Sequence, residues 1–451
     1  MKITIFTPTN GSEFLKELEQ SILSQTYTDW EWVILVNNTD LKITPADERI
    51  KVFYHTKPTK SIGQLKKITC SHATGDILLE ADHDDILTSN CLEMVAEAFK
   101  DDSIGFVYSD NAKFDMRNAF VPYSKRYGWT FREIIYNNTK LIAMRTFKPT
   151  PFRFSYIWYQ PDHVRAWRKS VYDELGGHDE SYEVCDDSEL MIRTYLNTNI
   201  YHIPEVLYIY RITGENTWLK RSKEIQEITK KLHKENYDKL IIKYRKDHGI
   251  KQNKKVKVTI ITPTYKPDFD KILNMIKSVQ AQTFDDYEHI ICADSPHPEV
   301  EDFIKSLNDD RIIYMHTLEK SKDQGHTVRN TVLEFALGDY VFFLDDDNII
   351  FPNALKDFVE SFTKDVKFIV ADILHMGPLP RHRGPPPIVM TGEPVRLYDV
   401  DTMNCMLDKK ALIESGGWET QYKFCGDGYT FERMAKYFRY KKIQKLIGVH
   451  L

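Results

Sequence analysis

The sequence predicts two consecutive α/β domains, each built around a mainly parallel sheet. The first observation behind this prediction is a repeated phrase, GDILLEADHDD at residues 75–85 and GDYVFFLDDDN at residues 338–348. In both copies the first acid of the cluster lies seven residues after the glycine, and a cation, Lys66 or Arg329, lies nine residues before it. The second is Thr-Pro-Thr, which closes an apolar run at residues 7–9 and again at 262–264. The repeats indicate one chemical site that was built twice.

Length and composition agree with a two-domain globular protein. At 451 residues the chain is too long for one ordinary core, and 42% hydrophobic and 28% charged residues are typical of globular domains. The net charge of −5 excludes a globally basic protein that coats nucleic acid. No apolar run approaches the ~18 residues needed to span a bilayer. Six cysteines without a Cys-x-x-Cys pair, and an N-terminus unlike a signal peptide, predict reduced thiols, no structural zinc and a cytoplasmic location.

The elements of each unit follow the order strand, helix, strand. In the first unit we expect a turn at residues 7–11 after the first strand and Ser12 as the helix N-cap, because Ser accepts from free backbone amides. Short polar turns between such elements predict right-handed βαβ units. The expected strands and helices span residues 2–6, 12–25 and 32–36 in the first unit, and 258–261, 272–279 and 289–292 in the second.

A basic connector separates the two units. Residues 220–257 hold 14 Lys or Arg against 5 Asp or Glu, a net charge of +9, and their apolar residues keep roughly helical spacing. We expect a first domain at 1–218, a basic helical connector at 219–256 with a linker near 249–255, and a second domain at 257–451. The connector is either a solvated helical arm that packs on the first domain or a docking surface for anionic lipid or an acidic glycan.

The acid clusters predict a metal site in each domain. Ligands of open parallel sheets bind at the carboxyl ends of the strands, and acids crowded there repel one another unless a cation is present. Carboxylate oxygens suit Mg²⁺ or Mn²⁺, which also bind phosphates, and Lys66 or Arg329 could face the same diphosphate. The alternative is an exposed turn or a helix N-terminus, where Asp is common. Recurrence in the same register favours the metal site.

Together these motifs resemble family-2 glycosyltransferases of the GT-A fold. The phrase Gln-Thr-(Tyr/Phe) at residues 25–27 and 282–284 adds to the resemblance, which covers nearly the whole chain twice. It implies two tandem GT-A domains, Rossmann-like and mainly parallel, joined by the basic helical connector. The resemblance implies Mn²⁺ or Mg²⁺ held by Asp82 and Asp84 in the first domain and by Asp345 and Asp347 in the second. The implied nucleotide-sugar contacts are Pro8, Asn37, Asn38, Lys66, Asp82, Pro263, Asp294, Arg329 and Asp345.

The residue that ends the second strand should contact the nucleotide base. In the family this residue is an acid. Asp294 fits, whereas Asn37 or its neighbour Asn38 departs from the pattern. An amide oxygen can accept from a uracil or thymine N3–H, but the amide NH₂ can equally donate. The base preference of the first domain therefore stays open.

A downstream pair of phrases supplies candidate general bases. Ten residues separate the second glycine of a Gly-Gly pair from Asp187 in the first unit and from Asp427 in the second. The family's xED motif, whose last acid deprotonates the acceptor, resembles these lines; the structural alternative is a carboxylate that caps the following helix. His450 falls near the family's third metal ligand, or is simply a solvated residue near the chain end. The first unit has Tyr210 in that region and no histidine.

The segment between acid cluster and base is longer in the first unit and rich in aromatic residues. Trp129, Phe154 and Trp167 are among them. Aromatic faces suit sugar rings and loops over a sheet often set the acceptor, but buried core under a long loop explains the same composition.

These inferences predict a metal-dependent inverting glycosyltransferase with two active sites. The expected donors are UDP-, dTDP- or GDP-linked sugars, and the acceptor is a growing glycan or glycolipid, with possible peripheral contact at a membrane. One alternative is a single catalytic domain beside a binding or bracing one. Another is a nucleotidyltransferase, which would release pyrophosphate. A nucleic-acid partner is the least favoured reading, and strong salt-dependent DNA binding would support it.

Overall fold

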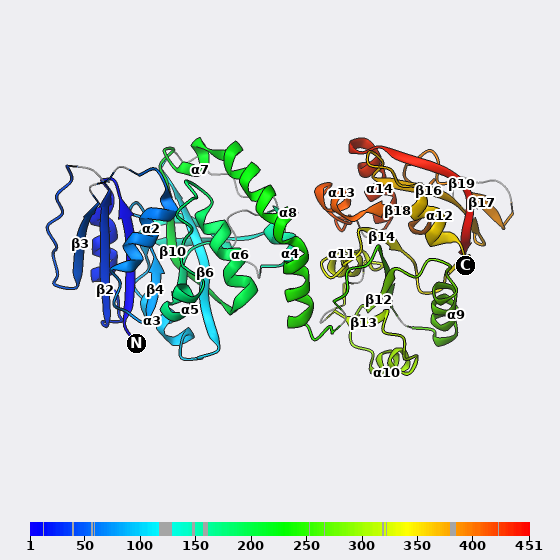
Figure 1. The fold of residues 1–451 in the computed structure, drawn as a ribbon, viewed down its shortest axis with the longest axis horizontal. Coiled ribbons are helices and arrows are strands. Elements are labelled where there is room, and N and C mark those ends of the chain that lie inside the picture. Colours follow the sequence, from blue (N-terminus) through cyan, green and yellow to red (C-terminus); the bar gives the residue numbers. More distant parts are fainter. Residues whose placement is uncertain are drawn as a thin grey trace. The chain divides into compact units, whose positions relative to one another are not determined.

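The computed structural model describes residues 1–451 except 12, 38–39, 56, 58, 117–128, 147–148, 157–160, 252, 266, 318–319, 322, 379–384 and 423. The chain divides into two compact units, Met1–Leu240 and Ile241–Leu451 (Figure 1). The division falls inside one long helix, α8 (Ser222–Asp247), in the region where the sequence predicts the connector.

The first unit has a ten-stranded mixed sheet with β3-β2-β1-β4-β9-β6-β10-β5 as its main order; β8 pairs with β6 and β7 with β8. Strands β1 to β4 run parallel, as predicted, whereas β9 enters antiparallel between β4 and β6. The strands are β1 (Ile3–Thr9), β2 (Trp30–Asn37), β3 (Ile50–His55), β4 (Ile77–Glu80), β5 (Ile86–Leu87), β6 (Ile104–Asp115), β7 (Thr130–Tyr136), β8 (Thr139–Arg145), β9 (Arg165–Arg168) and β10 (Asn199–Ile212).

The second unit repeats this order, β13-β12-β11-β14-β18-β16-β19-β15, with β17 beside β16. Strand β18 is the antiparallel counterpart of β9. The strands are β11 (Val258–Thr264), β12 (Tyr287–Ala293), β13 (Ile312–His316), β14 (Tyr340–Phe343), β15 (Ile349–Ile350), β16 (Phe368–His375), β17 (Ile388–Met390), β18 (Cys405–Asp408) and β19 (Tyr440–His450).

Helices flank both sheets. Those of the first unit are α1 (Leu15–Leu23), α2 (Ile62–Ser71), α3 (Cys91–Ala98), α4 (Pro151–Tyr156), α5 (Lys169–Glu174), α6 (Asp186–Asn197) and α7 (Thr217–Lys220). Those of the second are α9 (Phe269–Gln280), α10 (Pro298–Ser306), α11 (His326–Leu333), α12 (Ala354–Ser361), the 3₁₀ turn η2 (Thr402–Asn404), α13 (Lys409–Glu414) and α14 (Gly426–Tyr437). Among the described residues, no helix combines the length and the apolar character needed to cross a membrane.

The predicted turn at residues 7–11 is instead largely strand. Residues Thr7 to Thr9 continue β1 and pair with β2, where Pro8 lies opposite Leu35. The strand tolerates a proline there because pairing with β4 ends at Phe6, so no backbone donor is needed on that side. Helix α1 begins at Leu15, preceded by Phe14, and the predicted N-cap Ser12 lies outside the described residues.

The repeated glycine is fixed by close packing rather than by the active site. A Cβ on Gly75 would lie 2.7 Å from the carbonyl oxygen of Lys2, and one on Gly338 would lie 2.3 Å from the amide nitrogen of Thr259. The Gly75 amide donates to the Thr4 hydroxyl at 2.9 Å. A side chain cannot be accommodated at either position, so the glycine before each acid-bearing strand recurs for steric reasons.

The apolar residues of helix α8 pack against the first unit, as expected for a helical arm that packs on the first domain. Ile225 and Leu232 are 4% and 5% exposed, and Ile225 clusters with Val184 and Cys185 of the first unit. Near the end of α8, Arg245 forms a fully buried ion pair with Glu288 at 2.8 Å in the second unit. Residues of the connector therefore pack into the core of the first unit and form a buried ion pair in the second.

Candidate active sites

In each unit the candidate residues gather where the parallel strands end. Strand β4 ends at Glu80, and its backbone continues directly into Asp82 and Asp84. Strand β14 ends at Phe343 and leads to Asp345 and Asp347 in the same way. Sheet edges of this kind are the usual ligand sites of open α/β folds.

The acids of the first cluster have separate roles. Asp85 is buried and accepts the backbone N–H of Arg211 at 2.7 Å, so it anchors the turn to β10. Asp82 keeps 37% of its side chain exposed and lies 3.8 Å from His163 Nε2, while Asp84 is partly exposed. Asp82 and Asp84, which the family resemblance assigns to the metal, are thus the two acids of this cluster that reach solvent.

Beneath this cluster the first unit buries a network of charged side chains. Lys66, 7% exposed, pairs with Glu80 at 2.5 Å and with Asp186 at 3.3 Å. Arg165, 2% exposed, pairs with Asp187 at 2.9 Å and lies 3.8 Å from Glu80. Lys66 therefore compensates the buried carboxylates of Glu80 and Asp186, and its predicted contact with a diphosphate stays a prediction.

This network determines the charge state of the first candidate base. Burial acts to raise the pKa of Asp187, but the positive charges of Arg165 and Lys66 outweigh it and hold the pKa below its usual value. The second carboxylate oxygen accepts the Ser188 N–H at 2.7 Å in the first turn of α6. Asp187 thus contacts the first turn of α6 and, through Arg165, lies close to Glu80 at the end of β4; its role as general base stays a prediction.

The second unit places its cation and acids differently. Arg329 is 4% exposed, pairs with Asp345 and donates to the carbonyl oxygen of Gln324 at 2.9 Å. Asp346 accepts the Thr264 hydroxyl at 2.6 Å, and Asp347 lies 3.4 Å from Lys271 Nζ. Arg329 therefore pairs with the acid cluster itself, whereas its counterpart Lys66 pairs with Glu80 and Asp186.

Apolar and small residues replace the charged network in the second unit. Phe343 stands where the first unit has Glu80, Cys405 takes the register position of Arg165, and Gly426 that of Asp186. Trp418, 2% exposed, fills the position of His178 and contacts Phe343 with ring centroids 4.3 Å apart. The base in this unit consequently lies in a less charged environment.

Asp427 carries no ion pair among the described residues. It lies in the first turn of α14, and burial, reinforced by the nearby charge of Asp401, raises its pKa to about 6. A carboxylate with a raised pKa and no bound cation is a stronger proton acceptor than one held by arginine. The two candidate bases therefore differ in chemistry although they share one sequence position.

The predicted third metal ligand, His450, contacts Asp401, Asn348 and His375. Its Nδ1 lies 3.3 Å from the buried carboxylate of Asp401 and 3.5 Å from the side-chain nitrogen of Asn348, and its ring stacks on His375 at 4.3 Å. Burial lowers the pKa of His450, but the hydrogen bond and charge of Asp401 outweigh it and raise the pKa to about 9. The charges of Asp345 and Asp347 also raise this pKa, so His450 lies near the acid cluster, and its role as a third metal ligand stays a prediction.

The described residues contain no group of three or more His, Cys, Asp or Glu side chains arranged to hold a metal ion. Each unit nevertheless has two partly exposed aspartates one residue apart. They are Asp82 and Asp84 in the first unit and Asp345 and Asp347 in the second. These hard oxygen donors fit Mg²⁺ or Mn²⁺, which commonly complete their coordination with phosphate and water.

The predicted base contacts end the second strands as expected. Asn37 closes β2; its amide nitrogen donates to the carbonyl oxygen of Thr59 at 3.4 Å, and its oxygen is buried without a hydrogen-bond partner among the described residues. Asn38 lies outside the described residues. Asp294 follows β12 and accepts the amide and hydroxyl of Ser321 at 2.9 and 3.0 Å. Pro8 and Pro263 lie on the adjoining strands β1 and β11.

Several functional neighbours escaped sequence reasoning. Arg165 lies in the aromatic-rich insert, and only the antiparallel insertion of β9 brings it to Asp187. Asp401, which pairs with His450, belongs to none of the repeated motifs of the sequence. Glu80 carried a usable signal, because a charge at the end of an otherwise apolar strand is rarely buried without a partner.

The aromatic-rich insert supplies core where it is described. Trp129, Phe154 and Trp167 are 2%, 3% and 0% exposed, and the Trp167 indole donates to Thr194 at 3.1 Å. These three rings therefore follow the structural alternative and offer no face to a sugar.

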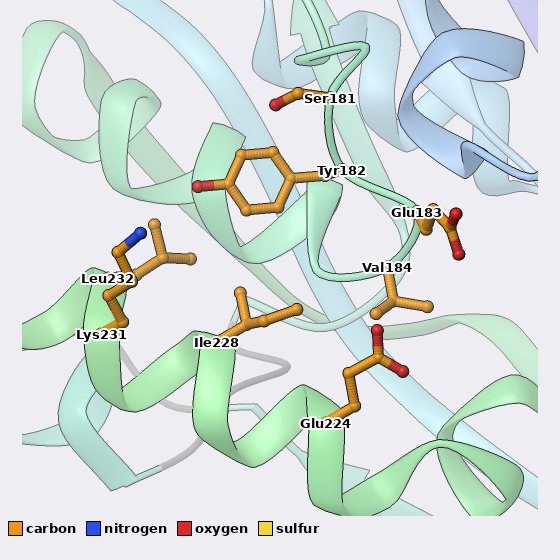
Figure 2. A pocket seen from close by; sticks show the side chains of 8 residues that line it. All are labelled: Ser181, Tyr182, Glu183, Val184, Glu224, Ile228, Lys231 and Leu232. Carbon is orange, nitrogen blue, oxygen red and sulfur yellow. The ribbon is translucent and has the colours of Figure 1, made fainter.

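A pocket of about 340 Å³ lies on the loop that precedes the first base. Figure 2 shows this loop on one side of the pocket and α8 on the other. The lining side chains are Ser181, Tyr182, Glu183, Val184, Glu224, Ile228, Lys231 and Leu232. Helix α8 thus covers the loop without filling the space beside it.

Comparison with known proteins matches both units to one family. The family model described as "Glycosyl transferase family 2" matches residues 4–176 and 259–414. Chondroitin synthase from Escherichia coli is 25% identical over 279 residues, 60% of this chain and 37% of that protein. The O-antigen biosynthesis protein RfbC of Myxococcus xanthus is 22% identical over 483 residues, 94% of this chain and 35% of that protein.

Among solved structures, S. aureus TarS 1-349 in complex with UDP-GlcNAc aligns at a TM-score of 0.39 and 14% identity. The alignment covers 55% of this chain and 73% of that one. The chain spans only 37% and 35% of the length of the two sequence relatives.

Proposed function

Because the chain belongs to glycosyl transferase family 2, it is a glycosyltransferase, and we propose that both of its domains transfer sugars from nucleotide-diphosphate donors. The observation that carries this proposal is the paired arrangement of an acid cluster and a candidate base at the same sheet edge in each unit. The proposed donors are UDP-, dTDP- or GDP-linked sugars. The proposed acceptor is a growing glycan or glycolipid, in keeping with relatives named for chondroitin and O-antigen synthesis.

The proposed reaction is a single displacement with inversion. The acceptor hydroxyl oxygen attacks the anomeric carbon, the bond to the diphosphate breaks, and Asp187 or Asp427 takes the hydroxyl proton. Such a positioned base typically contributes 10²–10⁴-fold to the rate. Asn37 and Asp294 orient the nucleotide base. Asp82 with Asp84, and Asp345 with Asp347, would hold Mn²⁺ or Mg²⁺, which when bound neutralises charge on the departing diphosphate.

Separate Asp187→Asn and Asp427→Asn variants test this proposal. If both sites work, each variant loses one transfer by roughly 10²–10⁴-fold and keeps the other, because the amide is isosteric but cannot accept the proton. Released nucleoside diphosphate is the readout, and release of pyrophosphate would instead identify a nucleotidyltransferase. A thermal shift with each nucleotide sugar, with and without Mn²⁺, identifies the donor and tests the metal requirement.

One observation favours a second candidate, in which only the second domain is catalytic. The 2.9 Å contact between Arg165 and Asp187 occupies the first base, whereas no cation pairs with Asp427 among the described residues. In that case Asp187→Asn leaves total turnover unchanged, and the first domain binds without transferring.

A further inference from the structure

One buried histidine of the first unit lies against the acid cluster. His163 is 6% exposed, and its Nε2 lies 3.8 Å from a carboxylate oxygen of Asp82, which is too long for a hydrogen bond. Its Nδ1 is buried without a hydrogen-bond partner among the described residues. The ring stacks on Tyr208 of β10, with centroids 4.7 Å apart. Because buried polar atoms are usually hydrogen-bonded, this fixed ring with an unpartnered nitrogen needs an explanation.

The two units place a histidine at different positions of the same site. Strand pairing of β10 with β5 and of β19 with β15 makes Tyr210 the counterpart of His450. The pairing of β9 with β4 and of β18 with β14 likewise makes His163 the counterpart of Met403. The first unit therefore has a histidine before β9 and a tyrosine on β10, whereas the second has a methionine before β18 and a histidine on β19.

These two positions are neighbours within a unit. In the first unit the rings of His163 and Tyr210 have centroids 6.3 Å apart. In the second, His450 Nδ1 lies 3.5 Å from the side-chain nitrogen of Asn348, the residue that follows the aspartates of the cluster. The exchange thus keeps one imidazole beside each acid cluster and changes the strand that carries it. Packing alone would accept any ring at either position, whereas a ligand role requires the imidazole.

The spacing in the first unit suits two ligands of one metal ion. With metal–ligand distances of about 2.1 Å, two ligands of an octahedral ion lie about 3 Å apart when adjacent and about 4 Å apart when opposite. The 3.8 Å between His163 Nε2 and Asp82 falls within this range. Phosphate oxygens and water would supply the remaining ligands, because the described residues form no group of three such side chains. Mg²⁺ keeps oxygen ligands, whereas imidazole binds first-row transition ions, so a nitrogen ligand favours Mn²⁺.

From this geometry we propose that His163 is a ligand of the divalent cation in the first domain and makes that site select Mn²⁺ over Mg²⁺. The inference rests on the proposed function, because it takes Asp82 and Asp84 as the place where the cation binds. It assigns the nitrogen ligand to the segment before β9, whereas the family resemblance assigns it to the last strand. If His163 only packed on Tyr208, its replacement would not change the choice between the two metals.

The test is pulsed EPR of Mn²⁺ bound to the full chain. Asp345→Asn combined with Asp347→Asn removes the proposed cation site of the second domain, so the spectrum reports the first site alone. The probes are Mn²⁺ with UDP, with dTDP and with GDP. Labelling of histidine with ¹⁵N identifies an imidazole ligand, because the coupling to Mn²⁺ then changes from ¹⁴N to ¹⁵N. A histidine coupling is expected, and both His163→Gln and His163→Met, which introduces the residue of the second unit, should abolish it.

His83→Gln is the matched control, because His83 lies between Asp82 and Asp84 in the sequence. This variant should keep the histidine coupling and the affinity for Mn²⁺. By contrast, His163→Gln should weaken Mn²⁺ binding at least about tenfold and Mg²⁺ binding much less, as measured by competition. Equal loss of both metals would indicate a packing role and overturn the inference. A coupling that disappears in His83→Gln and persists in His163→Gln would also overturn it.

Coupling to phosphorus separates this inference from the proposed function. Bound Mn²⁺ that couples to ³¹P of the diphosphate but to no histidine nitrogen, with His163 intact, contradicts only the assignment of His163. This outcome needs no substitution at His163, so it does not depend on whether those variants fold. Absence of Mn²⁺ binding with all three nucleotides contradicts the metal-dependent part of the proposed function, and the inference with it.

Discussion

The pH dependence of transfer should differ between the two domains. A general base acts in its deprotonated form, so activity is lost as the pH falls through the pKa of the base. Burial and Asp401 raise the pKa of Asp427 to about 6, whereas Arg165 and Lys66 outweigh burial and keep the pKa of Asp187 below its usual value. For a pKa of about 6, roughly 90% of Asp427 is ionised at about pH 7 and roughly 10% at about pH 5. The second transfer should therefore slow about tenfold over this interval, while the first stays nearly constant.

The assay measures kcat/KM for the donor across pH in buffers of constant ionic strength. Asp187→Asn isolates the second site and Asp427→Asn the first, and nucleoside diphosphate release is followed in each. Thermal melting at each pH excludes unfolding as the cause of any loss. A flat profile for the second site, or the same inflection in both sites, would refute the assignment of the two environments.

Arg165→Met links the profile to its structural cause. Without the contact at 2.9 Å, burial and the neighbouring carboxylates should move the pKa of Asp187 upward. An inflection should then appear in the first transfer, in the isolated background of Asp427→Asn. If the first profile stays flat in this variant, Arg165 does not set the charge state of Asp187.

The buried ion pairs give two further predictions for stability, both measured by urea unfolding. Arg165→Met should lower the free energy of unfolding by about 3–5 kcal/mol, because it leaves buried carboxylates uncompensated. Adding Glu80→Gln should recover part of that loss. Fully additive effects of the two substitutions on the free energy of unfolding would contradict the coupling. Arg245→Met should also lower the free energy of unfolding by about 3–5 kcal/mol, since Arg245 and Glu288 are both fully buried. Lys251 is exposed, so Lys251→Met should change the free energy of unfolding by less than about 0.5 kcal/mol. Equal effects of the two substitutions would refute the burial argument.

Most strands and helices named from the sequence could be predicted from local residue patterns. The apolar runs and their spacing predict β1, β2, α1 and their counterparts because the strand and helix periods are properties of neighbouring residues. The repeat supplies the equivalence of the two units, and the cluster position follows from the end of an apolar strand. The extension of β1 through Pro8 was missed because it depends on where pairing with β4 ends, which is a contact between distant residues. Helix α1 begins at Leu15, three residues after the predicted start.

The interior of the first site depends on contacts distant in sequence. Arg165 reaches Asp187 only because β9 enters the sheet antiparallel between β4 and β6. The burial of Lys66 follows from the same contact set, since its partners Glu80 and Asp186 come from different parts of the chain. Sequence spacing places a cation nine residues before the glycine, but it does not determine whether that cation faces solvent or a buried carboxylate.

The differences between the two sites compensate one another. Glu80, Arg165 and Asp186 of the first unit become Phe343, Cys405 and Gly426 in the second, so three charged residues are replaced as a set.

Replacing Arg165 alone by its counterpart in the second unit leaves buried carboxylates short of a cation, because Arg165 pairs with Asp187 at 2.9 Å and lies 3.8 Å from Glu80. An uncompensated buried charge costs several kcal/mol, which is a large fraction of the stability of a domain. The two environments therefore surround one candidate base position in different ways. Since each environment shifts the pKa of its own aspartate in a different direction, the buried neighbours are sufficient to distinguish two candidate sites that share a fold and an acid cluster.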